Sequence, residues 1–276
     1  MEPVYTPVIT VARGLFALQG LKFTKVGEDH VPRTGGAVMA INHTGYMDFT
    51  FAGLAARKSK RLVRFMAKDV VFDHPISGPL MRGMKHIPVD RTAGTASYHA
   101  AVEALRAGEI VGVFPEATIS RSFELKEFKH GAARMAIEAG VPILPVIIWG
   151  SQRVWTKGHP KRLGRTNTPI ILSVGAPVAA PAGADPTELT AQYKAVMAQL
   201  LEQARAGYEP LTGPDLKYLP ASLGGTAPTL AEATRMDEAD AAARLRQAAE
   251  RRAAQQRAER ESGGRRDSSG RTGSTS

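Results

Sequence analysis

The 276-residue sequence contains no cysteine. This absence excludes a disulfide framework and a thiol nucleophile, and it fits a reducing compartment. The sequence also lacks any run of about 18 uncharged apolar residues that would span a bilayer. Its first residues do not show the apolar core and small-residue cleavage site of a signal peptide. We therefore expect a protein that is exposed to the cytoplasm and is not integral to a membrane.

Aromatic residues are scarce, at 6% of the sequence, although the net charge is +10. Residues 225–276 hold ten arginines and eight acidic residues, so most of the basic excess belongs to the rest of the chain. Such an excess favours anionic partners, which include nucleic acids, phospholipid surfaces and phosphorylated substrates. A basic nucleic-acid-binding protein is a distant alternative, because neither a phosphate-binding arm nor an aromatic stacking platform is evident. No nucleic-acid partner is expected.

Patterns that bind metals or nucleotides are also missing. The histidines outside the motif described below are scattered without ligand spacing, and no cysteine joins them. Gly35-Gly36 lacks the spacing of a nucleotide-binding loop, and no G-x4-G-K-[ST] motif occurs. The sequence therefore predicts no zinc site and no ATP or NAD cofactor.

What the sequence does contain is an alternation of apolar runs and helical patterns. Apolar runs at 37–41, 62–67, 110–114 and 143–148 are separated by helix-like segments, which predicts an α/β domain. Asp185-Pro186-Thr187-Glu188 provides an N-cap, a proline at the first helical position and a capping acid, so a last amphipathic helix is expected to begin there.

The two ends of the chain differ from this middle part. Residues 1–24 carry apolar side chains at helical spacing, which is typical of an interfacial membrane helix and equally of an ordinary core-packing helix. We predict a membrane-associating helix at 1–24, a catalytic domain at 25–224 and a charged tail at 225–276. The tail is expected to be helical from about 231 to 260 and disordered over 262–276.

The stretch Asn42-His43-Thr44-Gly45-Tyr46-Met47-Asp48 places an imidazole five residues before a carboxylate, directly after an apolar run. Thr44-Gly45 indicates a turn, so we expect His43 in the turn and Asp48 in the first turn of the following helix. There the carboxylate can fix the imidazole tautomer while the ring takes a proton from an attacking hydroxyl. The pair is predicted to be a general base and its orienting residue.

A second motif, Phe114-Pro115-Glu116-Ala117-Thr118, follows the apolar run at 110–114. Ligands commonly bind beyond the carboxyl ends of strands in α/β sheets, so this motif is expected to face His43. Asp90-Arg91 lies between the two motifs, and Val141-Pro142-Ile143-Leu144-Pro145-Val146 follows them.

In this order, the motifs resemble those of the PlsC-like 1-acyl-sn-glycerol-3-phosphate acyltransferase (lysophosphatidic acid acyltransferase) family, whose first motif is N-H-x4-D and whose third is F-P-E-G-T. The resemblance implies an α/β fold with a mixed sheet flanked by helices and an N-terminal membrane element. It implies transfer of a fatty acyl group from acyl-CoA or acyl-carrier protein to the free hydroxyl of 1-acylglycerol-3-phosphate, which forms phosphatidic acid. It also implies peripheral attachment to the cytoplasmic face of the cell membrane, and no metal or redox cofactor.

The same resemblance assigns roles to individual residues. His43 would be the general base and Asp48 its orienting residue, in a direct transfer without an acyl-enzyme. Glu116 and Thr118 match the third motif and would help to form the acceptor site. The candidate phosphate ligands, whose planar guanidinium groups suit phosphate, are Arg91 and Arg121.

Two departures from the family pattern concern the acceptor. Ala117 replaces the usual glycine of the third motif, and Ile119 stands where many members carry an arginine. Phosphate binding could then fall to Arg121 or Lys68. Alternatively, the acceptor is another lysophospholipid, a glycolipid or a lyso-aminolipid.

Overall fold

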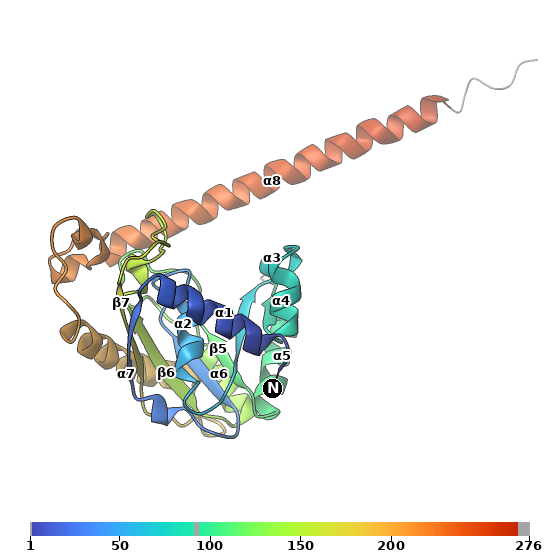
Figure 1. Cartoon of the computed structure of the whole chain (residues 1–276). Coiled ribbons are helices and arrows are strands. Elements are labelled where there is room, and N and C mark those ends of the chain that lie inside the picture. The colour runs from blue at the N-terminus through green and yellow to red at the C-terminus, as the bar shows by residue number, and fades with distance from the viewer. Residues whose placement is uncertain (1, 91–93, 270–276) are drawn as a thin grey trace, which may run out of the picture. The chain divides into compact units, whose positions relative to one another are not determined.

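The computed structural model describes residues 2–90 and 94–269, and the chain divides into two compact units between Ala227 and Pro228. The strands of the first unit form one sheet, and its described residues contribute seven strands in the order β1-β7-β6-β2-β5-β3-β4 (Figure 1). The strand bounds are β1 Lys22–Val26, β2 Ala37–Ile41, β3 Val63–Lys68, β4 Ile87–Val89, β5 Ile110–Val113, β6 Ile143–Trp149 and β7 Pro169–Val174.

The sheet is mixed. The neighbours β6-β2, β2-β5, β5-β3 and β3-β4 pair in parallel, as do β1 and β7, whereas β6 and β7 are antiparallel. Because β2, β5 and β3 run in the same direction, the segments that follow them emerge at one edge of the sheet. The two sequence motifs therefore leave the sheet on the same side.

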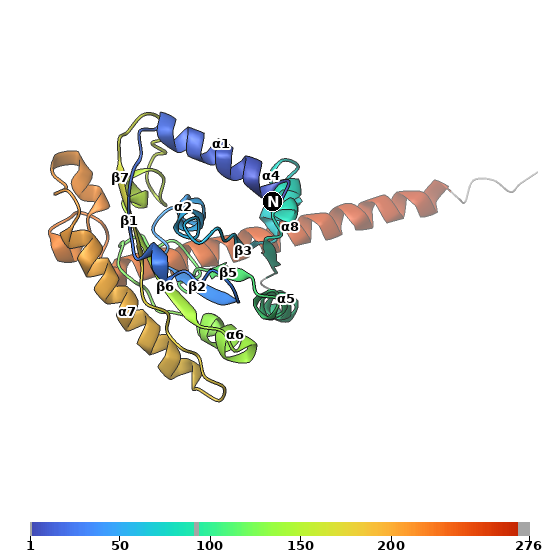
Figure 2. The same cartoon turned by 60° about the horizontal axis from the view of Figure 1, so that its bottom comes forward.

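Helices cover both faces of this sheet (Figure 2). The helices are α1 Tyr5–Leu18, α2 Asp48–Ala55, α3 Val70–Asp73, α4 Ser77–Gly83, α5 Gly94–Arg106, α6 Gly131–Ala139 and α7 Pro186–Ala206, with short 3-10 turns η1 Glu28–His30, η2 Ser151–Arg153, η3 Gly213–Tyr218 and η4 Ala221–Leu223. Alternate residues of β2 serve the two faces, as the period of a strand requires. Val38 and Ala40 pack in the core with α5, α6 and α7, whereas Met39 and Ile41 pack in the core with α2.

The four apolar runs and the capped helix that the sequence predicts are confirmed as β2, β3, β5, β6 and α7. Asp185 accepts a hydrogen bond from the Thr187 backbone N–H at 2.9 Å, and α7 ends directly before Gly207. The apolar runs of the sequence do not predict β1, β4 and β7. β1 is mostly exposed and β4 has three residues, so neither presents a buried apolar run, and β7 begins at a proline.

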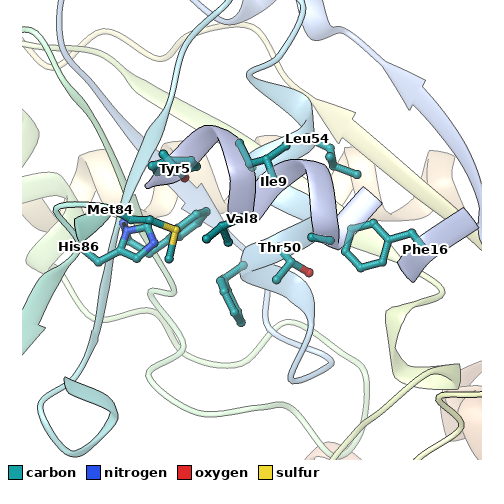
Figure 3. Close-up of a pocket in the computed structure, with 12 residues that line it drawn as sticks. Tyr5, Val8, Ile9, Phe16, Thr50, Leu54, Met84 and His86 are labelled. Carbon is teal, nitrogen blue, oxygen red and sulfur yellow. Dashed lines mark hydrogen bonds between the residues drawn. The ribbon is translucent and has the colours of Figure 1, made fainter. Parts of the chain in front are cut away.

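The N-terminal helix α1 packs on the first unit. Tyr5 and Phe16 are buried, and the Tyr5 hydroxyl donates to the Val63 carbonyl at 2.8 Å. Its inner face also lines an apolar pocket (Figure 3). The residues that line this pocket are Tyr5, Val8, Ile9, Ala12, Phe16, Phe49, Thr50, Gly53, Leu54, Phe65, Met84 and His86. The predicted boundary at 24/25 falls inside β1, which belongs to the sheet.

The second unit contains α8, which runs from Leu230 to Ser269. A capping box begins this helix. Glu232 accepts from the Thr229 backbone N–H at 2.9 Å, and the Glu232 N–H donates to the Thr229 hydroxyl at 3.3 Å. The predicted helix at 231–260 lies within α8. The predicted disordered segment begins inside its last turns, and residues 270–276 of that segment lie outside the described residues.

Candidate active site

The first motif begins where β2 ends. The Asn42 side chain is almost fully buried and extends the hydrogen bonding between β2 and β6 by one residue. Its side-chain NH₂ donates to the Ile148 carbonyl at 3.0 Å, and its side-chain oxygen accepts from the Ile148 N–H at 2.7 Å. This bond pair fixes the point at which the chain leaves the sheet. His43 therefore starts its turn from a rigid position.

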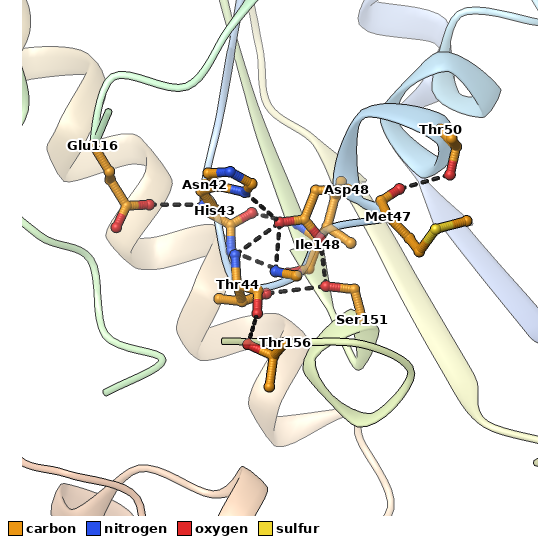
Figure 4. Close-up of polar contacts among 11 residues, drawn as sticks. Asn42, His43, Thr44, Met47, Asp48, Thr50, Glu116, Ile148, Ser151 and Thr156 are labelled. Carbon is orange, nitrogen blue, oxygen red and sulfur yellow. Dashed lines mark hydrogen bonds and ion pairs between the residues drawn. The ribbon is translucent and has the colours of Figure 1, made fainter. Parts of the chain in front are cut away.

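His43 and Asp48 contact each other as the sequence predicts, with the histidine in the turn and the aspartate as the first residue of α2 (Figure 4). His43 Nδ1 lies 2.9 Å from Asp48 Oδ2. Since a carboxylate can only accept, Nδ1 carries a proton, and in the neutral ring Nε2 has the lone pair that can accept one. The Asp48 side chain is fully buried, whereas 20% of the His43 side chain is exposed. The ring is thus oriented from inside the protein and accessible from outside.

The Asp48 carboxylate has further donors. Oδ2 also accepts from the backbone N–H groups of Thr44 at 2.7 Å and Gly45 at 2.8 Å, and Oδ1 accepts from the Ser151 hydroxyl. Two of these donors belong to the turn itself. Ser151 comes from η2, the segment that follows β6.

The loop after β6 supports the turn at two more points. The Thr156 hydroxyl donates to the Thr44 carbonyl at 2.6 Å, and the Tyr46 N–H donates to the Trp155 carbonyl at 2.9 Å. Gly45 leaves no room for a side chain here, since an added Cβ would lie 2.9 Å from the Ser151 hydroxyl oxygen and 3.0 Å from the Trp155 carbonyl oxygen. The turn is therefore held between α2 and residues 151–156.

Glu116 is 4% exposed and lies beside the histidine backbone. Its Oε1 accepts from the His43 N–H at 2.8 Å and its Oε2 from the Lys126 N–H at 3.2 Å. Burial raises the pKa of the Glu116 carboxyl to about 8, against the lowering influence of these two backbone donors. Through these hydrogen bonds, Glu116 connects the third motif to the backbone of the first motif.

The rest of the third motif also packs against the first. The Ser120 N–H donates to the His43 carbonyl at 2.7 Å, and the Phe114 ring stacks on the His43 ring with a centroid distance of 4.2 Å. Ala117 has a φ of +61°, in the left-handed region that favours glycine. The usual glycine of the family motif thus corresponds to a backbone conformation that this chain adopts with an alanine.

The candidate cations lie in different places. Arg121 lies against Gly158, because an added Gly158 Cβ would come within 2.9 Å of Arg121 Nη1. Lys68 is exposed at the carboxyl end of β3, where it pairs with Val89 of β4. Arg91 lies outside the described residues. Arg121 therefore lies in the loop that carries the third motif. Lys68 lies at the sheet edge from which both motifs emerge, on β3, two strands away from β2.

Lys126 is a further cationic side chain near the third motif, and it was not predicted from the sequence. Its ammonium group donates to the Thr118 hydroxyl at 2.6 Å, and its backbone N–H holds Glu116. Ile119, at the position of the usual arginine, is 6% exposed and packs inward. The spacing of eight residues between Lys126 and Thr118 gives no sequence signal, since only the fold of the intervening loop brings them together.

Within residues 2–90 and 94–269, no group of three or more histidine, aspartate or glutamate side chains could hold a metal ion. Among the helices of that described part, none is long and apolar enough to cross a membrane.

The chain is similar to several known proteins. Residues 22–149, which contain both motifs, match the family model described as Acyltransferase. The 1-acyl-sn-glycerol-3-phosphate acyltransferase of Bacillus subtilis is 29% identical over 138 residues, which are 49% of this chain and 67% of that protein. The protein of the same name from Borreliella burgdorferi is 28% identical over 146 residues, which are 51% of this chain and 56% of that protein. The chain thus matches between about half and two thirds of the length of these relatives.

Among solved structures, this chain is similar to the crystal structure of the 1-acyl-sn-glycerophosphate acyltransferase PlsC from Thermotoga maritima. The TM-score is 0.59 and the sequence identity 22%, with 72% of this chain and 78% of that chain covered. At this identity the likeness establishes the fold. It confirms the mixed α/β sheet flanked by helices that the motifs imply.

Proposed function

Because the chain belongs to the PlsC-like acyltransferase family, we propose that it transfers a fatty acyl group from acyl-CoA or acyl-carrier protein to the free hydroxyl of 1-acylglycerol-3-phosphate. The product is phosphatidic acid. The single observation that carries this proposal is the buried Asp48 carboxylate that holds His43 Nδ1 at 2.9 Å, with the third motif packed against the same histidine. No metal or redox cofactor takes part in the proposed reaction.

In the proposed mechanism, His43 Nε2 takes the proton of the acceptor hydroxyl while the hydroxyl oxygen attacks the thioester carbonyl carbon. The tetrahedral intermediate then collapses, the C–S bond breaks, and the departing thiolate takes the proton from the imidazolium. A new C–O ester bond forms without an acyl-enzyme. Asp48 keeps Nε2 in its basic tautomer and stabilises the imidazolium.

The test is acyl transfer from palmitoyl-CoA to lysophosphatidic acid in detergent, with the products resolved by mass spectrometry. His43→Ala should remove the transfer, whereas His99→Ala, which changes an exposed histidine of α5, should leave it intact. A His43→Ala protein that keeps more than a few per cent of the wild-type rate would refute the proposed base. Acyl-carrier protein replaces the CoA thioester in a second arm, so that the donor is tested separately.

A different acceptor is the second candidate, and the buried Ile119 is the observation that favours it. The third-motif loop offers Arg121 and Lys126 to an anionic group instead of an arginine at position 119. Competition of lysophosphatidic acid with lysophosphatidylglycerol and lysophosphatidylcholine decides between these acceptors. Preferential acylation of a lipid with a larger head group would show that lysophosphatidic acid is not the preferred acceptor. The proposed mechanism of acyl transfer would be unaffected.

We propose that the apolar pocket under α1 receives part of an acyl chain. Phe49 and Thr50, which line it, follow directly after Asp48 on α2. Gly53 also lines the pocket, and an added Cβ would lie 3.9 Å from the Phe65 ring, so a valine fits only by taking up pocket space. Gly53→Val should shift the preferred acyl chain to shorter lengths, whereas Gly14→Val on α1, where no atom lies within 4 Å of an added Cβ, should not. An unchanged chain-length profile would contradict this assignment.

We also propose that the protein attaches peripherally to the cytoplasmic face of the membrane through the outer face of α1. Val11, Leu15 and Leu18 are 63%, 54% and 72% exposed, although the inner face of the same helix is packed. Exposed apolar side chains of this size each gain about 1 to 2 kcal/mol on burial in an apolar phase.

Replacing Val11, Leu15 and Leu18 together by serine should lower binding to vesicles of phosphatidylglycerol and phosphatidylcholine at least tenfold. Leu163→Ser, a change to a leucine that is 46% exposed on a loop, serves as the control. Equal vesicle binding of the triple variant and the wild type would refute the role of α1.

A further inference from the structure

The two oxygens of the Asp48 carboxylate are held in different ways. Oδ2 has three donors, His43 Nδ1 and the N–H groups of Thr44 and Gly45, and all three lie within five residues of Asp48 in the sequence. Among the hydrogen bonds of the described residues, the partner of Oδ1 is the Ser151 hydroxyl, 103 residues away. The contact with Ser151 is therefore the one that ties the carboxylate to the sheet rather than to its own turn.

The direction of this hydrogen bond is determined by the groups present. A serine hydroxyl has one hydrogen, and an ionised carboxylate can only accept, so Ser151 donates to Asp48. Thr44 Oγ1 lies 3.1 Å from the Ser151 oxygen and must then be the donor in that pair. The hydroxyls form a directed chain from Thr44 through Ser151 to Asp48.

Burial and backbone geometry keep this chain in place. Ser151 and Asp48 are fully buried and Thr44 is 2% exposed, so water does not compete for these hydrogen bonds. Gly150, with a φ of +101°, makes the turn that follows β6 and brings Ser151 toward the first motif. The residue before Gly150 is Trp149, the last residue of a fully buried strand, which gives the serine a rigid base.

We infer that Ser151 is a positioning residue for the acyl transfer, a role that rests on the function proposed above. Together with the three donors on Oδ2, its hydroxyl on Oδ1 fixes the rotation of the Asp48 carboxylate about its Cβ–Cγ bond. The rotation in turn decides whether Oδ2 lies in line with His43 Nδ1–H, because the ring is already constrained by its stacking on Phe114. Without the Ser151 donor, Oδ1 is no longer held, the carboxylate and the imidazole are less well oriented, and the transition state is reached less often.

Kinetics of three variants test this inference. Ser151→Ala removes the donor, Ser151→Thr keeps the hydroxyl, and Ser173→Ala changes a buried serine of β7 as the matched control. We expect kcat of Ser151→Ala to fall about 10- to 100-fold with KM within about twofold of the wild type, whereas Ser151→Thr recovers most of the rate and Ser173→Ala keeps all of it. A Ser151→Ala enzyme with wild-type kcat overturns the inference, and so does a rise in KM without a loss of kcat.

A second measurement does not need the substrate to be known. In protein labelled with ¹⁵N at histidine, the proton on His43 Nδ1 gives a downfield NMR signal that His43→Ala identifies by its loss. We expect this signal in the wild type, Ser151→Thr and Ser173→Ala, and we expect it to broaden or vanish in Ser151→Ala because the carboxylate no longer stays in line. An unchanged signal in Ser151→Ala overturns the inference. If the wild type makes no phosphatidic acid, the proposed function fails while the NMR comparison still decides the role of Ser151.

Discussion

The buried carboxyl of Glu116 gives the protein a dependence of stability on pH that can be calculated. Burial raises its pKa from 4.5 to about 8, so the folded protein holds a proton that the unfolded chain has released. The stability contributed by this proton is fully present below pH 4.5 and is lost as the pH rises through 8. Between these limits the free energy of unfolding falls by about 1.4 kcal/mol per pH unit.

A second buried group acts in the opposite direction at lower pH. Burial lowers the pKa of His86 from 6.5 to about 4, and the neighbouring Arg64 charge acts in the same sense. Its contribution is complete above pH 6.5 and is lost as the pH falls toward 4. The two groups therefore oppose each other below pH 6.5, and of this pair Glu116 is the one that changes stability between pH 6.5 and 8. Over this window we expect a loss of about 1.5 to 2 kcal/mol.

The assay is urea unfolding of the wild type, Glu116→Gln and Glu124→Gln at four values from pH 6.5 to 8. The wild type and Glu124→Gln, which alters a carboxylate bonded to Arg205 at 2.9 Å, should lose stability with rising pH. Glu116→Gln should show no such loss. It should also be about 1 to 3 kcal/mol less stable at pH 6.5, because its amide NH₂ group meets a backbone N–H where an oxygen accepted. Wild-type stability that stays level from pH 6.5 to 8 would refute the reasoning and show that Glu116 is ionised in the folded protein.

Three further predictions concern single residues. Asp48→Asn should lower kcat of acyl transfer by about 10³-fold or more, because an amide no longer selects the Nδ1–H tautomer; steady-state kinetics that show a loss of less than tenfold would be inconsistent with its orienting role. Ala117→Gly should raise the free energy of unfolding by about 0.5 to 1 kcal/mol, since relief of the left-handed φ exceeds the entropy that glycine adds to the unfolded chain; urea unfolding checks this, and a destabilised variant would contradict it. Gly112→Ala should lower the free energy of unfolding by about 1 to 3 kcal/mol, because an added Cβ would lie 2.6 Å from the Phe65 ring; an unchanged midpoint of thermal unfolding would show that the ring moves aside.

For the N-terminal helix, the structure confirms core packing on one side, whereas the interfacial interpretation stays a prediction. Its apolar residues at helical spacing predict either a core-packing or an interfacial helix. In the structure, Tyr5 and Phe16 on one side are buried, whereas Leu15 and Leu18 are largely exposed. Periodicity locates the apolar positions of a helix, but it does not determine how many of its sides another element covers.

Much of the fold and the contact between His43 and Asp48 could be predicted from the sequence. Buried strands such as β2 and β6 appear as continuous apolar runs because both of their faces are covered. The contact of His43 with Asp48 was predictable because one short turn joins His43 to the first residue of α2, so that spacing along the chain determines spacing in space.

Tertiary structure alone decided which distant groups complete the site. Ser151 reaches Asp48, and Lys126 reaches Thr118, through loops whose paths depend on the packing of the whole sheet. The family resemblance gives Glu116 a role in the acceptor site, which stays a prediction, and its described contacts are with the backbone of His43 and Lys126. A carboxylate in a motif has the same sequence signal whether it faces a ligand or a buried N–H. The sequence thus determined the chemical groups and their local order, and the fold determined their partners, because contacts between remote segments form only when the core is assembled.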